Sequence, residues 1–110
     1  MRKTLLATVL TVGLLVGSAG TGFADVTVIG AGNSSCGTWT AERQKAYSQG
    51  YSQWVWGFLS GIGYAGKGEF DPLHNMDGKG VAGWIDNYCR DHPIEDISAA
   101  AIAFFTAHPR

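Results

Sequence analysis

Two cysteines, Cys36 and Cys89, are the residues whose chemistry bears most on the rest of the chain. They are not spaced as zinc ligands, because the sequence contains no CxxC or HxxxH pair. A nucleophilic role for one cysteine would leave the other unpaired in an oxidising compartment. An even number of cysteines in an exported chain favours a disulfide. Closing a loop of about 54 residues would stabilise the domain by roughly 4 kcal/mol in the chain-entropy model.

The start of the chain indicates export. Two basic residues precede an uncharged apolar stretch over 4–16, and Gly22 and Ala24 occupy the −3 and −1 positions of a cleavage site. This layout predicts a secretory signal peptide over 1–24, a single domain over 25–110 and a periplasmic or secreted location. The alternative is an uncleaved membrane anchor, although the apolar stretch is shorter than a spanning helix.

The expected mature chain is mildly acidic. Removal of Arg2 and Lys3 would leave six Lys and Arg against nine Asp and Glu, a net formal charge of −3. The absence of a basic cluster argues against nucleic acid and anionic membrane as partners. The aromatic content indicates a folded domain, and its four tryptophans are Trp39, Trp54, Trp56 and Trp84.

The spacing of apolar residues predicts an all-α fold, a small domain of three or four helices with one disulfide. Residues 25–37 indicate an extended N-terminal arm, with or without a short strand, followed by a loop. The first helix is expected to be capped by Thr38 or Thr40 and to run to about Tyr64. Its apolar residues recur on one face: Tyr47, Tyr51, Trp54, Val55, Phe58, Leu59 and Ile62.

Three glycines, Gly50, Gly57 and Gly61, line up beside this apolar face. A glycine inside a helix costs up to about 1 kcal/mol, so the stripe predicts close approach of another helix, the one that carries Trp84. The alternative is a break in the helix at Gly57 or Gly61. With close approach, Gly57→Leu is expected to destabilise by about 1–3 kcal/mol through overpacking.

Two further helices are expected after a loop over 65–78. One covers 79–91, and the other starts near Pro93, where Glu95 and Asp96 suit the positive end of a helix. The inner faces are expected to consist of Val81, Trp84, Ile85, Tyr88 and Cys89 in the first and of Ile94, Ile97, Ala101, Phe104 and Phe105 in the second.

The loop over 65–78 is the one segment with several potential metal ligands. The stretch LHNMDG has the composition of a calcium loop, but Leu73 and Trp84 would occupy its first and last ligand positions and cannot coordinate. A solvated acidic loop is therefore expected, a loose metal site is the alternative, and no metal or cofactor is predicted. The polar side chains in this loop are Glu69, Asp71, His74, Asn75 and Asp77.

No set of nucleophile, base and orienting group can be assembled, so the chain is not expected to be an enzyme. Ser60 in GFLSG is one place away from the serine of a G-x-S-x-G elbow and lacks the strand–turn–helix context. His92, beside Pro93, is expected to be a helix cap or an exposed turn residue and not a base. His74 and His108 have no predictable partner.

A binding role is the remaining expectation. Trp56 lies opposite the apolar face of the first helix, so it is either covered by the N-terminal arm or exposed as an aromatic anchor for a partner. The residues expected to contact a protein client or partner are Tyr51, Trp54, Trp56, Phe58 and Ile62.

The segment LHNMDGKGVAGWIDNYCRDHPIEDISAA resembles the corresponding part of the HdeA/HdeB-type periplasmic acid-stress chaperones. In that family an acidic loop leads into a helix that ends in a cysteine, followed in HdeB-like members by a basic residue and a His-Pro step. The resemblance implies pairing of Cys89 with Cys36 and a holdase function for unfolded proteins. The first helix here is richer in tryptophan and glycine than in the family, and the lysine-rich C-terminal tail is absent.

The charge balance is compatible with such a mechanism. Near pH 2 the net charge would change from about −3 to about +10, and self-repulsion would loosen the fold. The aromatic face of the first helix would then be released from the other helices or from a second copy of the chain in a homodimer. The alternative function is that of an inhibitor or immunity protein that binds one specific exported enzyme or toxin through a fixed patch.

Overall fold

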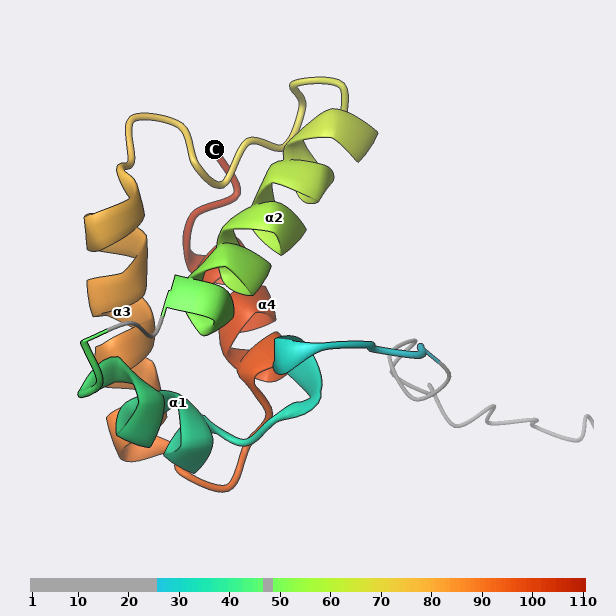
Figure 1. The fold of residues 1–110 in the computed structure, drawn as a ribbon. Helices are drawn as coiled ribbons and strands as arrows, with labels where there is room; N and C mark the ends of the chain where they lie inside the picture. Colours follow the sequence, from blue (N-terminus) through green and yellow to red (C-terminus); the bar gives the residue numbers. More distant parts are fainter. Residues whose placement is uncertain (1–25, 47–48) are drawn as a thin grey trace, which may run out of the picture.

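The computed structural model describes residues 26–46 and 49–110, and in this part of the chain every regular element is helical (Figure 1). The predicted all-α fold with one disulfide and an N-terminal arm is therefore confirmed. The signal peptide predicted over 1–24 and the predicted core residue Tyr47 lie outside the described residues. The elements in order are the short 3-10 helix η1 (Ala31–Asn33) and the α-helices α1 (Cys36–Arg43), α2 (Gln49–Ala65), α3 (Gly78–Asp91) and α4 (Ile97–Ala107).

The prediction of a single first helix is wrong, because α1 and α2 are separate helices. Ser35 caps α1, and its Oγ accepts a hydrogen bond from the Thr38 backbone N–H at 3.1 Å. Neither Thr38 nor Thr40 is the cap. Helix α1 packs mainly against α3, whereas α2 packs mainly against α4 and η1. One straight helix cannot make both contacts, and accordingly α1 ends at Arg43 and α2 starts at Gln49.

Helix α3 agrees with the sequence prediction to within one residue. Its N-cap is Asp77, whose Oδ1 accepts a hydrogen bond from the Gly80 N–H at 2.7 Å. Asp and Asn are among the preferred N-cap residues because their side chains satisfy an unpaired backbone donor. The predicted inner face is buried or packed against the core: Val81, Ile85 and Cys89 are fully buried, and Trp84 and Tyr88 are partly buried.

Helix α4 begins later than expected, and Ile94 is not on its inner face. The backbone of Asp96 is extended and bridges Ser35, because Cys36 N–H donates to the Glu95 carbonyl at 2.7 Å and Ile97 N–H donates to the Ser34 carbonyl at 2.8 Å. Ile94 therefore lies in the turn before the helix and is 92% exposed. The other expected residues are buried or packed on the core: Ile97, Ala101, Phe104 and Phe105.

The core lies where the four helices meet. Its largest fully buried side chains are Trp39 from α1, Leu59 from α2, Ile85 from α3 and Phe104 from α4. Every helix thus contributes at least one large side chain to a single cluster. No helix in the described part of the chain is long and apolar enough to cross a membrane.

The prediction that another helix approaches the glycine stripe is wrong. A Cβ added at Gly50, Gly57 or Gly61 would meet nothing within 4 Å, so these glycines face open space. Gly57 and Gly61 also lie inside α2, so neither breaks the helix. Close packing on glycine occurs elsewhere: a Cβ at Gly32 would overlap the Trp54 ring, and one at Gly78 would lie 2.8 Å from Trp56.

Candidate binding surface

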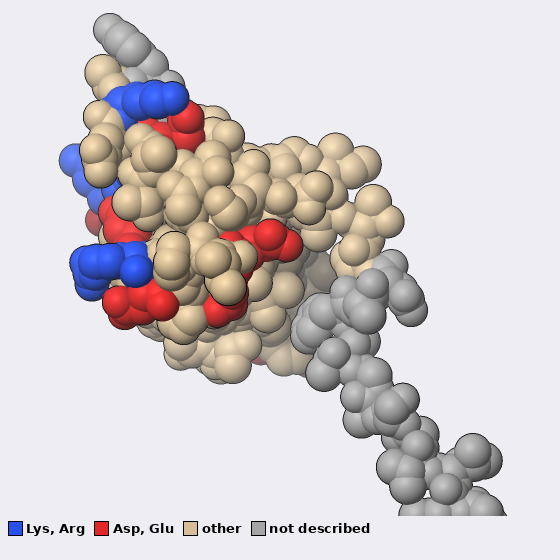
Figure 2. Space-filling view, turned by 90° about the horizontal axis from the view of Figure 1, so that it is seen from below, with Lys and Arg blue, Asp and Glu red and all other residues tan. Residues whose placement is uncertain are grey.

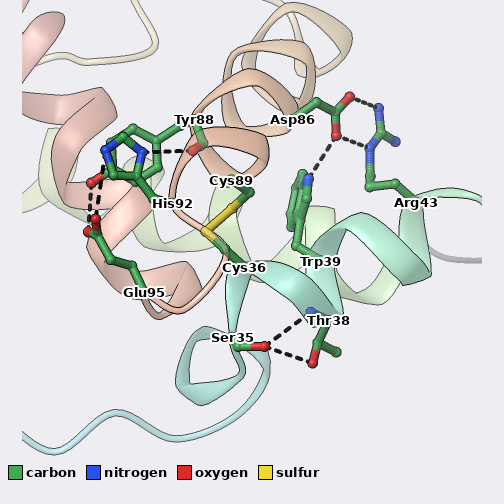
Figure 3. The surroundings of a disulfide bond; sticks show 10 residues. All are labelled: Ser35, Cys36, Thr38, Trp39, Arg43, Asp86, Tyr88, Cys89, His92 and Glu95. Carbon is green, nitrogen blue, oxygen red and sulfur yellow. Dashed lines mark hydrogen bonds and ion pairs between the residues drawn. A yellow bond between two sulfur atoms is a disulfide. The ribbon is translucent and has the colours of Figure 1, made fainter.

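The disulfide joins the first residue of α1 to the last turn of α3. Cys36 and Cys89 are bonded, both are fully buried, and their Cα atoms are 4.7 Å apart (Figure 3). The predicted pairing is confirmed. Among the described residues, no group of three or more His, Cys, Asp or Glu side chains is placed to hold a metal ion.

A polar network next to the disulfide forms a second link between α1 and α3. Asp86 accepts hydrogen bonds from Trp39 Nε1 at 2.7 Å, from Arg43 Nε at 2.8 Å and from Arg43 Nη2 at 2.9 Å (Figure 3). Partial burial by itself raises the pKa of Asp86, but the hydrogen bonds from Arg43 and Trp39 outweigh it and lower this pKa below its usual value of 3.8. The carboxylate is therefore the favoured form at neutral pH.

Two histidines end helices in the same way. His92 Nδ1 lies 2.9 Å from the Tyr88 carbonyl and its ring stacks on the Tyr88 ring at 4.1 Å. His108 Nδ1 lies 3.0 Å from the Phe104 carbonyl and its ring stacks on Phe104 at 4.3 Å. The cap predicted for His92 is confirmed. His108 has the same role, which the repeated pattern of an aromatic residue four places before His-Pro would have revealed.

Tyr88 also links α3 to the turn before α4. Its hydroxyl donates to Glu95 Oε1 at 2.7 Å. Burial and this hydrogen bond raise the pKa of Tyr88 to about 12, so the phenol keeps its proton over the physiological range. The remaining histidine, His74, is exposed, and its Nδ1 lies 3.6 Å from Asp71 Oδ2. The three histidines therefore form no shared polar site.

The tryptophans of α2 have different neighbours from those expected. Trp56 Nε1 donates to the Gly78 carbonyl at 3.1 Å, so Trp56 packs on the start of α3 and is only partly exposed. The N-terminal arm packs on Trp54 instead, whose Nε1 donates to the Ile29 carbonyl at 2.9 Å. Trp54 also stacks on Phe58 with ring centroids 5.2 Å apart. Trp56 therefore packs on α3 and is neither covered by the arm nor fully exposed.

An apolar groove lies between α2 and α4, with the N-terminal arm as its third wall. Its volume is about 540 Å³, which is within the usual range for ligand sites. Of the five residues predicted to contact a partner, Phe58 and Ile62 line the groove, whereas Tyr51, Trp54 and Trp56 do not. The lining residues are Val26, Val28, Asn33, Phe58, Ile62, Asp96, Ser98, Ala99, Ile102 and Phe105.

Charge is divided unequally over the molecule. The segment 26–41, helix α2 and helix α4 contain no Asp, Glu, Lys or Arg. All charged side chains of the described chain belong to the end of α1, to α3 and to the turns and the C-terminal tail. Figure 2 shows charged side chains gathered mainly toward one side, beside a broad uncharged area. The groove therefore lies within a part of the surface that is almost free of charge.

The chain matches no protein-family model, no curated protein and no solved structure. The resemblance to the HdeA/HdeB-type chaperones stays a prediction. Function has to be inferred from the surfaces and contacts of this chain itself.

Proposed function

We propose that this protein is an exported binding protein of the HdeA/HdeB type, which holds apolar segments of unfolded proteins when acid loosens its fold. The uncharged α2–α4 surface carries this proposal. Aromatic side chains on α2 are only partly buried there, as Trp54 and Phe58 show. A folded domain rarely leaves a large contiguous apolar patch exposed unless the patch serves in binding.

Acid would weaken the link between α1 and α3. Because the pKa of Asp86 is lowered in the folded state, its contribution to stability is complete above the usual value of 3.8 and is lost as pH falls through the lower, folded pKa. The net charge of the protein becomes more positive over the same pH range, which adds repulsion between its like charges. Both effects act below about pH 4, where a periplasmic acid response would need them.

The disulfide would keep the loosened chain compact. It encloses α1, α2 and α3 in one covalent loop, so α2 stays near the other helices after their packing is lost. The described part of the N-terminal arm is held on Trp54 by packing and by the hydrogen bond to the Ile29 carbonyl, and it contains no charged side chain. A loosened arm would expose more of the groove to a client.

Suppression of client aggregation at pH 2–3 and at pH 7 tests the proposal. We expect suppression at acid pH only, together with a red shift of tryptophan emission and increased dye binding between pH 5 and pH 2. Ile62→Lys should abolish suppression, since it places a charge in the groove. Gly61→Lys is the matched control, because its side chain points into open space. Flat emission and dye binding, with no effect on the client, would rule out the holdase.

The second candidate is an inhibitor or immunity protein with one specific partner. The groove is already formed in the folded state, which also suits a fixed patch. Such a protein would bind its partner equally at neutral and mildly acidic pH. A pull-down from periplasmic extract at pH 7 and pH 3 separates the two: one saturable partner at pH 7 supports the inhibitor, and many proteins at pH 3 support the holdase.

A further inference from the structure

We propose that the folded protein binds small amphipathic amines in the α2–α4 groove at neutral pH, with the alkyl chain along α4 and the cationic head at Asp96. This inference goes beyond the proposed holdase function, because it concerns the folded state and a small molecule. It rests on the shape of the groove and on the placement of its single charge.

The apolar part of the groove suits an alkyl chain. Phe58 and Ile62 on α2 face Ile102 and Phe105 on α4 across it, and the arm encloses it on a third side. From Asp96 to Phe105 the helix rises by about 13 Å at 1.5 Å per residue. A decyl chain has a similar length and would cover this apolar surface.

The polar end of the groove determines which head group of a ligand is favoured. Among the described residues that line the groove, Asp96 is the only charged one, and Asn33 and Ser98 are polar. The Asp96 side chain makes no capping hydrogen bond to α4, so its oxygens are free to accept from a ligand. The positive end of the α4 dipole opposes a cation there, but it corresponds to only about half a unit charge. The negative carboxylate therefore dominates.

Anionic amphiphiles would be disfavoured at the same place. The described lining of the groove contains no Lys or Arg, so a carboxylate or sulfate head would meet Asp96 without a compensating cation from these residues. A neutral head group would bind through the alkyl chain alone. The structure thus implies an order of affinity in which the cation binds more tightly than the neutral molecule, and the neutral molecule more tightly than the anion.

Calorimetric titration of the oxidised protein at pH 7 tests this order with decylammonium, decyl maltoside and decyl sulfate, each below its critical micelle concentration. We expect decylammonium to bind at least tenfold more tightly than decyl sulfate. Asp96→Asn should reduce this preference to less than about twofold and leave decyl maltoside unchanged. Asparagine is an equally good N-cap residue, so the fold is retained.

A second variant tests the position of the alkyl chain. Ala99→Phe fills the groove and should weaken all three probes at least tenfold, whereas Ala107→Phe, on an exposed position of the same helix, should not. Equal affinity for the three probes in the native protein would overturn the proposal. So would a cation preference that survives Asp96→Asn, or binding that survives Ala99→Phe. Because the assay contains no protein client and no acid step, its failure leaves the holdase proposal untouched.

Discussion

The contact between α1 and α3 and the contact between α2 and α4 are made by different kinds of interaction. Between α1 and α3 there is a disulfide, an ion pair and a tryptophan hydrogen bond. Between α2 and α4 there are only apolar contacts, and neither helix carries a charge. The α1–α3 contact thus contains a reducible bond and an ionisable carboxylate, whereas helices α2 and α4 contribute neither to theirs.

Removal of the disulfide should have the largest effect. Cys36→Ser with Cys89→Ser opens a loop of about 54 residues, for which the chain-entropy model gives a loss of roughly 4 kcal/mol. A domain of this size has little stability to spare, so the variant should be largely unfolded at 37 °C. Urea titration followed by circular dichroism measures the loss. A midpoint equal to that of the native protein would contradict the assignment of the disulfide as the main stabilising link.

The next largest effect is expected in the other half of the molecule. Gly32→Ala places a methyl group where the Trp54 ring lies, so the arm has to shift or detach. We expect a loss of about 1–3 kcal/mol from overpacking, with a change in tryptophan emission that marks the detached arm. An unchanged melting temperature and emission would show that the arm does not pack on Trp54.

Asp86→Asn should have a smaller effect on stability and a clear effect on its pH dependence. The ion pair is about one third exposed on both sides, so solvent screening limits the loss to about 1 kcal/mol. Stability should then fall less steeply below pH 4, because the group with the lowered pKa is gone. Asp91→Asn, an exposed change on the same helix, is the control. Equal acid sensitivity of the native and Asp86→Asn proteins would exclude Asp86 as a contributor.

The smallest effect is expected on the open face of α2. Gly57→Ala meets no neighbour, and alanine favours the helix by up to about 1 kcal/mol over glycine. The variant should therefore be stabilised by about 0.5–1 kcal/mol, the opposite of the loss that the sequence predicted for a larger residue here. Thermal unfolding measures the sign. Destabilisation would mean that a partner or a second copy packs on this face.

The parts of the fold that depend on local signals could be predicted from the sequence. Helix α3 has an N-cap, a regular apolar face and a proline two residues beyond its end. The disulfide could be predicted from an even number of cysteines together with the predicted signal peptide. This pairing also sets a register from which a further contact could have been predicted, since Trp39 lies three places after Cys36 and Asp86 three places before Cys89. The two side chains therefore meet across the same helix contact.

The break between α1 and α2 and the surroundings of the glycines could not be predicted. The described residues that follow α1, 44–46, include no proline or glycine, so the end of α1 reflects the packing of α1 and α2 on different partners. Periodicity places Gly57 beside an apolar face but does not say whether a helix lies over it. Of the five expected binding residues, only Phe58 and Ile62 line the groove. The other walls come from the N-terminal arm and α4, and the periodicity of the sequence does not specify how these elements pack on α2.

The position of the disulfide along the chain has a mechanical consequence. Tension applied to the two ends of the described chain passes directly from Cys36 to Cys89 and bypasses α1, α2 and α3. Only the N-terminal arm and the chain beyond Cys89, with α4, can extend. The arm and α4 are two of the three walls of the groove, so a pulling force would dismantle the groove while the enclosed loop bears no load.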